Sequence, residues 1–105
     1  MVKKAKPQAK ERRQLEKLLV KVPAEYVFYC HDGSVFADLR ELAEGLQAMS
    51  DETFAYHSNL EKQDFSNWIR DVIGDEELAN DLAKAVSRLQ AAGYLVARIA
   101  LLTSK

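Results

Sequence analysis

Cysteine, proline and glycine are scarce in this chain. Its 105 residues include one Cys, two Pro and four Gly. A single cysteine cannot form an internal disulfide, which excludes a small secreted domain stabilised by disulfides and favours a reducing compartment. The low content of Gly and Pro excludes collagen-like and linker-like chains. We therefore expect a cytoplasmic protein.

Long apolar runs are missing as well. The most apolar stretch, residues 94–102, is interrupted by Arg98, and no stretch has the ~18 apolar residues that a membrane-spanning helix needs. The basic start of the chain is not followed by an apolar segment, so we expect no signal peptide. The composition that remains, 48% hydrophobic and 30% charged, is typical of a single folded domain.

Charges of the two signs are unevenly distributed, although the net charge is only −1. Residues 1–21 contain eight Lys or Arg and two Glu, whereas the remainder contains seven basic and fourteen acidic residues. Such a basic arm either binds a polyanion (RNA, DNA or a membrane surface), keeps the terminus solvated, or folds back on the acidic body. The residues that would contact a nucleic acid are Lys3, Lys4, Lys6, Lys10, Arg12, Arg13 and Lys17.

The polarity of the chain changes near residue 9. Residues 1–8 are polar and include Pro7, so we predict a disordered basic arm there and a single helical domain over residues 9–105. The first helix of that domain is expected to run from residue 9 until just before Pro23. Its apolar stripe, at helical spacing, consists of Leu15, Leu18, Leu19 and Val22.

A small β-hairpin is expected near residues 26–36. Tyr26, Phe28 and Tyr29 favour a β-strand, and the turn signal Asp32-Gly33 follows them. Val35 and Phe36 can pair back on this strand. The aromatic side chains could form a stacking platform for RNA, but the segment has no interleaved basic residues. We therefore predict that they pack in the core.

Capping residues predict where the next helices begin. Asp38, with Glu41 three positions later, has the spacing of a capping box. Ser50 and Asp64 are N-cap candidates for the two helices that follow. Gly74 is expected to end the third of these helices in the left-handed conformation.

The last helix is expected to begin at Asp75 and to run to about residue 102, with Gly93 weakening it without breaking it. Together these patterns predict a mainly α fold, a compact bundle of four or five short helices with the small hairpin. The expected core consists of Leu42, Leu46, Phe54, Phe65, Trp68, Ile69, Leu78 and Leu82.

Motifs of catalysis and of metal binding are missing from the sequence. It contains no GxGxxG, GxxxxGK or GxSxG sequence and no HxxxH or CxxC pair. His57 with Asp64 could shuttle protons or bind a metal, but a structural role fits its place beside Phe54 better. Cys30 is interpreted as a small buried hydrophobe. The acidic cluster 75–77 fits a helix N-terminus. We expect no catalytic residue, metal or cofactor.

Several short segments resemble a small bacterial and archaeal domain family of unknown function. The resemblance covers about residues 26–82 and is carried by His57 and by the segments 28–33, 39–43, 49–54, 64–69 and 75–79. It implies a compact cytoplasmic domain, found alone or attached to other domains. It implies no activity, so no catalytic role is carried over.

The function predicted from these patterns is a non-enzymatic protein-interaction module. Apolar residues continue beyond those that a domain of this size needs for its core, and they point to several sides of the last helix. The predicted partner-binding residues are Leu95, Val96, Ile99 and Leu102, and the partner is another protein or a second copy of the chain. The alternative is a nucleic-acid or ribonucleoprotein accessory protein that uses the basic arm.

Overall fold

The computed structural model describes residues 17–103. Within that range the fold is mainly helical, with one small antiparallel sheet, and this confirms the predicted fold class. The elements in chain order are η1 (Ala24–Tyr26), β1 (Phe28–Tyr29), β2 (Val35–Phe36), α2 (Leu39–Ala48), α3 (Asp51–His57), α4 (Asp64–Trp68), η2 (Ile69–Ile73), α5 (Glu76–Ala83) and α6 (Arg88–Thr103). The predictions for residues 1–16 lie outside the described residues.

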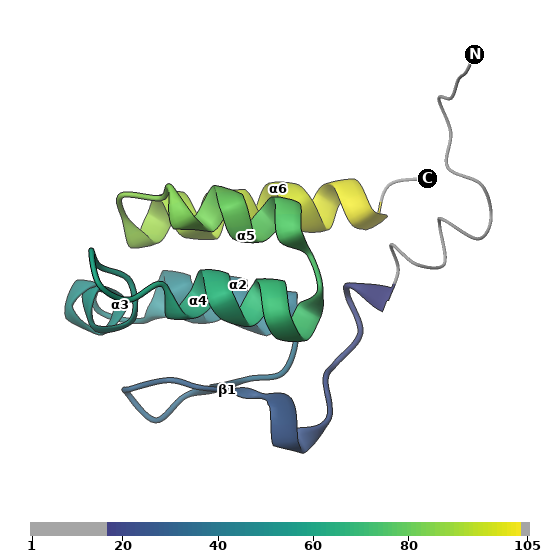
Figure 1. Ribbon diagram of the computed structural model, residues 1–105, viewed down its shortest axis with the longest axis horizontal. Helices are drawn as coiled ribbons and strands as arrows, with labels where there is room; N and C mark the ends of the chain where they lie inside the picture. Colours follow the sequence, from purple (N-terminus) through teal and green to yellow (C-terminus); the bar gives the residue numbers. More distant parts are fainter. Residues whose placement is uncertain (1–16, 104–105) are drawn as a thin grey trace, which may run out of the picture.

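The helices form two layers, and the hairpin lies below them in the view of Figure 1. Helix α6 packs against α2 and α5, and α5 packs against α4. Strand β2 contacts α2 from the other side, so that α2 lies between the hairpin and α6. Helix α6 therefore has one side against the bundle and one side away from it.

The hairpin forms where it was predicted, with the pairs Phe28–Phe36 and Tyr29–Val35. Gly33 takes a φ of 94° in the turn, a conformation that favours glycine. The first strand is shorter than expected, because Tyr26 lies in a 3₁₀ turn instead. The Tyr26 carbonyl accepts a hydrogen bond from Trp68 Nε1 at 2.8 Å, which anchors this turn to α4.

The segment before the hairpin differs from the prediction. The helix expected up to Val22 does not reach it, since residues 18–22 are non-helical. Val22 N instead donates to the Ala37 carbonyl at 2.8 Å, which draws the chain alongside the end of the hairpin. The stripe residues Leu18, Leu19 and Val22 nevertheless pack against the core.

Two of the predicted N-caps have the expected geometry. The Asp38 carboxylate accepts from Glu41 N at 2.8 Å, and Ser50 Oγ accepts from Thr53 N at 3.0 Å. The return bond of the capping box goes to a different residue, because Glu41 accepts from Ala37 N rather than from Asp38 N. Asp64 is not an N-cap: it is the first residue of α4, and no side chain caps that helix.

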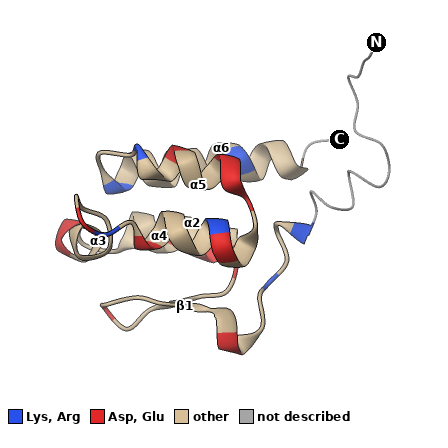
Figure 2. Cartoon of the chain, in the orientation of Figure 1, with Lys and Arg blue, Asp and Glu red and all other residues tan. Residues whose placement is uncertain are grey.

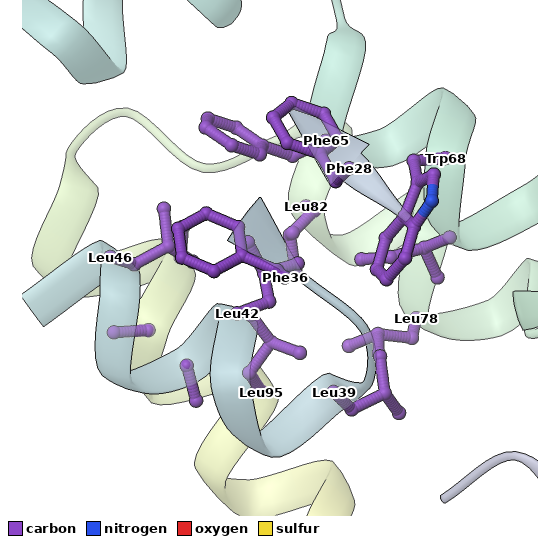
Figure 3. Packing of buried hydrophobic residues seen from close by; sticks show 14 of the residues in the cluster. Phe28, Phe36, Leu39, Leu42, Leu46, Phe65, Trp68, Leu78, Leu82 and Leu95 are labelled. Carbon is purple, nitrogen blue, oxygen red and sulfur yellow. The ribbon is translucent and has the colours of Figure 1, made fainter. Parts of the chain in front are cut away.

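All eight residues of the predicted core are buried. The hairpin adds Phe28 and Phe36, and Figure 3 shows Phe28 beside Phe65 and Phe36 over α2. The rings of Phe28 and Phe65 stack with centroids 5.0 Å apart. The Phe36 ring also accounts for the glycine at position 45, because a Cβ on Gly45 would lie only 2.2 Å from this ring. The outward residues Tyr26 and Tyr29 are exposed, so their predicted core packing is wrong.

The predicted last helix is two helices. Gly74 has a φ of 90° and Asp75 caps α5 as expected, but α5 ends at Ala83 and α6 begins at Arg88. The break is not at Gly93, which lies inside α6. Ser87 restarts the helix: its Oγ accepts from Gln90 N at 3.1 Å, while Gln90 Oε1 accepts from Val86 N at 2.7 Å, one residue before the donor in a capping box.

Candidate functional site

Helix α6 carries the candidate binding surface, and two arginines hold its orientation. Arg88 Nη1 donates to the carbonyls of Leu46 and Gln47 at 2.9 and 2.8 Å, which satisfies free carbonyls at the end of α2. Its Nε also donates to Asp51 at 3.0 Å. The N-terminal end of α6 is thereby attached to the junction of α2 and α3.

Arg98 holds the middle of α6 against the start of α5. Its Nε and Nη2 donate to the two oxygens of Asp75 at 2.8 and 3.0 Å, and Asp75 is only 2% exposed. This hydrogen bonding raises the pKa of the Arg98 guanidinium. The same carboxylate caps α5 through Leu78 N at 3.1 Å. The acidic cluster at residues 75–77 thus begins a helix, as predicted, and Asp75 also binds α6.

The inward side of α6 belongs to the core. Its buried residues are Ala91, Ala92, Leu95 and Leu102, and Ile99 is partly buried against the same cluster. Two of the four predicted partner-binding residues, Leu95 and Leu102, are therefore unavailable to a partner. The reason is the phase of the helix: α6 packs against α2 and α5, and these two leucines lie in the buried core cluster. Of the predicted set, Val96 is the exposed one, at 51%.

The side of α6 that faces away from the bundle carries no charge. We define the α6 outer face by five of the exposed residues of α6, namely Leu89, Gly93, Val96, Ala97 and Ala100; Gln90, Leu101 and Thr103 are also exposed and lie beside this stripe. At 100° per residue the positions of the α6 outer face fall on one stripe. Arg88 and Arg98 are the charged residues of α6 and are bound to neighbouring elements, and most of α6 is uncharged in Figure 2. The result is a continuous apolar surface on a helix that the core holds in place.

Gly93 has no intramolecular explanation among the described residues. Gly33 and Gly74 have a positive φ, and Gly45 makes room for Phe36. Gly93 has no positive φ, and a Cβ built on it would meet nothing within 4 Å. A glycine inside a helix costs about 1 kcal/mol relative to alanine. On the exposed side, its effect is to leave the backbone of α6 open to close approach.

His57 has structural partners at both ring nitrogens. His31 N donates to Nε2 at 2.9 Å, so Nε2 is the unprotonated nitrogen, and Nδ1 donates to Asp64 at 2.9 Å. The ring is buried between Phe28 and Phe65, with centroids 5.1 and 5.2 Å away. These contacts join the hairpin, α3 and α4, and they leave neither nitrogen free for a metal or a substrate. They agree with the structural interpretation of His57.

The other candidates for chemistry also have local explanations. Cys30 is a free, buried thiol, as predicted, and burial raises its pKa. The neighbouring His31 ring stacks on Tyr56 with centroids 3.9 Å apart. Across residues 17–103, no three His, Cys, Asp or Glu side chains are grouped so that they could hold a metal ion.

Only one of the seven basic residues assigned to nucleic-acid binding lies within the described part of the chain. Lys17 is exposed there, while Lys3, Lys4, Lys6, Lys10, Arg12 and Arg13 lie outside it. The nucleic-acid alternative therefore stays a prediction.

Sequence analysis missed Leu89, Gly93, Ala97 and Ala100 as surface residues. It predicted one continuous helix from Asp75 to about residue 102, whereas α6 starts anew at Arg88 and Leu89 is 62% exposed. A signal for the correct phase was present, because Ser87 and Gln90 have the spacing of a capping box.

Comparison with models of protein families, with curated proteins and with solved structures found no match. The resemblance to a small domain family stays a prediction.

Proposed function

We propose that this chain is a non-enzymatic protein-interaction module that binds its partner through the α6 outer face. The observation that carries the proposal is the charge-free exposed stripe with Gly93 at its centre. Exposed surface on a folded domain is normally interspersed with charge, and a contiguous apolar patch marks a site of association. The apolar stripe lies on a helix whose other side is in the core, so it is presented rigidly.

The positions of the polar groups support a module without catalytic machinery. Among the ionisable residues that sequence analysis considered for chemistry, His57, Asp64 and Asp75 are each bound in a contact between elements. An acid–base catalyst needs a nitrogen or oxygen that can reach a substrate. The free thiol of Cys30 is consistent with a cytoplasmic location. No helix within residues 17–103 has the length and hydropathy of a membrane span.

Site-directed photo-crosslinking in the native cell tests this function. A photo-reactive residue at position 96 is compared with one at position 35, because Val96 and Val35 are 51% and 49% exposed and lie on different surfaces. We expect a protein adduct of defined mass from position 96 and none from position 35. Equal labelling from the two positions, or no adduct from position 96, would contradict the proposed function.

A further inference from the structure

We infer that the α6 outer face binds a second copy of this chain, with two α6 helices lying antiparallel about a two-fold axis at Gly93. The inference rests on the proposed function and names its partner. It follows from the order of side-chain sizes along the stripe, from the charges on and around it, and from the open position at Gly93.

Side-chain size changes along the stripe in a way that an antiparallel copy complements. A large residue, Leu89, lies four positions before Gly93 and is 62% exposed. Two small exposed residues, Ala97 and Ala100, lie after it, and Val96, 51% exposed, lies beside them at the edge of the stripe. A two-fold axis at Gly93 places each position beside the one equally far on the other side. Leu89 then shares a layer with Ala97 of the second copy.

The centre of the stripe permits the close approach that this packing needs. At the axis, Gly93 of one chain lies opposite Gly93 of the other, with no Cβ to separate the two backbones. Small residues at a helix crossing shorten the distance between the axes and increase the van der Waals contact. Val96 lies at the edge of this contact, level with the polar Gln90 of the second copy.

Charge also favours a copy of the same chain. A two-fold axis brings equivalent positions together, so any charge near it would meet a like charge. The α6 outer face has none. Antiparallel helices also place opposite ends of their dipoles side by side.

The N-terminal segment is a poor alternative occupant by its composition. Residues 1–16 contain six Lys or Arg, and their large apolar residues are Met1, Val2 and Leu15. Covering the stripe with this segment would bring several cations onto an apolar surface that offers them no partner.

The size of the stripe predicts a weak dimer. From Leu89 to Ala100 the stripe is about 16 Å long at 1.5 Å per residue. One such helix face is smaller than the ~800 Å² per partner that stable complexes bury. We therefore expect a concentration-dependent dimer with a dissociation constant of roughly 10–100 µM.

Sedimentation equilibrium of the purified chain, up to about 0.5 mM, tests the dimer and its register. Leu89→Lys and Ala97→Glu, made singly, are each expected to raise the dissociation constant at least about tenfold. Each substitution places a charge against an apolar side chain of the second copy. The double variant, Leu89→Lys with Ala97→Glu, brings the new cation of one chain beside the new anion of the other and is expected to recover the dimer. Val35→Lys, on the hairpin, is the matched control, and circular dichroism checks that each variant is folded.

Gly93→Ala gives a second readout that does not depend on introduced charge. The added methyl group meets nothing within its own chain, so the monomer should unfold at a higher temperature. The same methyl group separates the two backbones at the axis, so the dimer should weaken. A purely intramolecular role of Gly93 would change stability and leave association unchanged.

A wild-type chain that stays monomeric at the highest concentration would overturn the inference, as would a double variant no better than the single ones. Failure of the dimer is distinguishable from failure of the proposed function. If the pure chain is monomeric while position 96 crosslinks a different protein in the cell, the module stands and the second copy is wrong. If position 96 gives no adduct and the pure chain also stays monomeric, both are wrong.

Discussion

At the scale of single residues, buried polar side chains connect elements that are far apart in the sequence. His57 binds the backbone of His31 on one side and Asp64 on the other. Asp75 caps α5 and binds Arg98 of α6. Within the described residues, no buried side-chain nitrogen or oxygen lacks a partner. Removing one member of such a pair leaves the other member buried without a hydrogen-bond partner, which destabilises the fold.

His57→Ala is expected to destabilise the fold by about 1–3 kcal/mol, because His31 N–H loses its acceptor. Urea denaturation followed by circular dichroism measures the change. His31→Ala, which keeps the backbone donor, is the control and should cost less. Stability unchanged by His57→Ala, or stoichiometric metal uptake by the wild type that the variant loses, would contradict the structural role.

Cys30 should react slowly with an alkylating reagent in the folded protein. Burial raises the pKa of its thiol, so at neutral pH less of it is thiolate than for an exposed cysteine. The rate should increase only as the pH approaches this raised pKa, and it should be much faster in denaturant. Mass spectrometry of the labelled protein measures both rates. Equal rates in the folded and unfolded chain would show that Cys30 is accessible.

At the scale of secondary-structure elements, helix phase decides which side chains are buried. Helix α2 follows its predicted phase because Asp38 starts it where expected. Helix α6 does not, because Ser87 restarts the helix after residues 84–87. Both helices contain a glycine, and the surroundings of the two glycines differ.

Gly45→Ala and Gly93→Ala are expected to change stability in opposite directions. Both gain helix propensity of up to about 1 kcal/mol. At Gly45 the new Cβ would lie 2.2 Å from the buried Phe36 ring, and overpacking costs about 1–3 kcal/mol. Gly45→Ala should therefore be destabilising overall, and Gly93→Ala should be stabilising in thermal unfolding at low concentration. Equal effects of the two substitutions would show that Phe36 does not pack on Gly45 as described.

At the scale of the whole molecule, α6 completes the core and leaves one side unpartnered. Arg88 attaches it to α2 and Arg98 attaches it to α5, and its Leu95 is buried in the core. These attachments are unequal, because Asp75, the partner of Arg98, is buried, whereas Asp51, a partner of Arg88, is exposed.

Arg98→Ala is expected to cost about 3 kcal/mol or more, because it leaves the Asp75 carboxylate buried without its cation. Arg88→Ala should cost about 1 kcal/mol, since Asp51 stays hydrated and the freed carbonyls lie near the surface. Chemical denaturation of the two variants measures the difference. If Arg88→Ala were the more destabilising, the Arg98–Asp75 pair would not hold α6 as proposed.

The sequence by itself determined the helical class, the hairpin turn and the core. These depend on local spacing: apolar residues at helical period, Asp32-Gly33 in the turn, and caps such as Asp38 and Ser50. The eight expected core residues are buried because each lies on the apolar stripe of its own helix.

Only the tertiary structure decided which apolar residues of the C-terminal part stay exposed. Leu95 and Val96 are neighbours of similar hydropathy, yet one is buried against the bundle and the other is outside. The difference arises from the break at residues 84–87 and from two arginine contacts between elements far apart in the chain. Periodicity within one segment cannot reveal such contacts, since it records which residues share a face but not which face meets a neighbour.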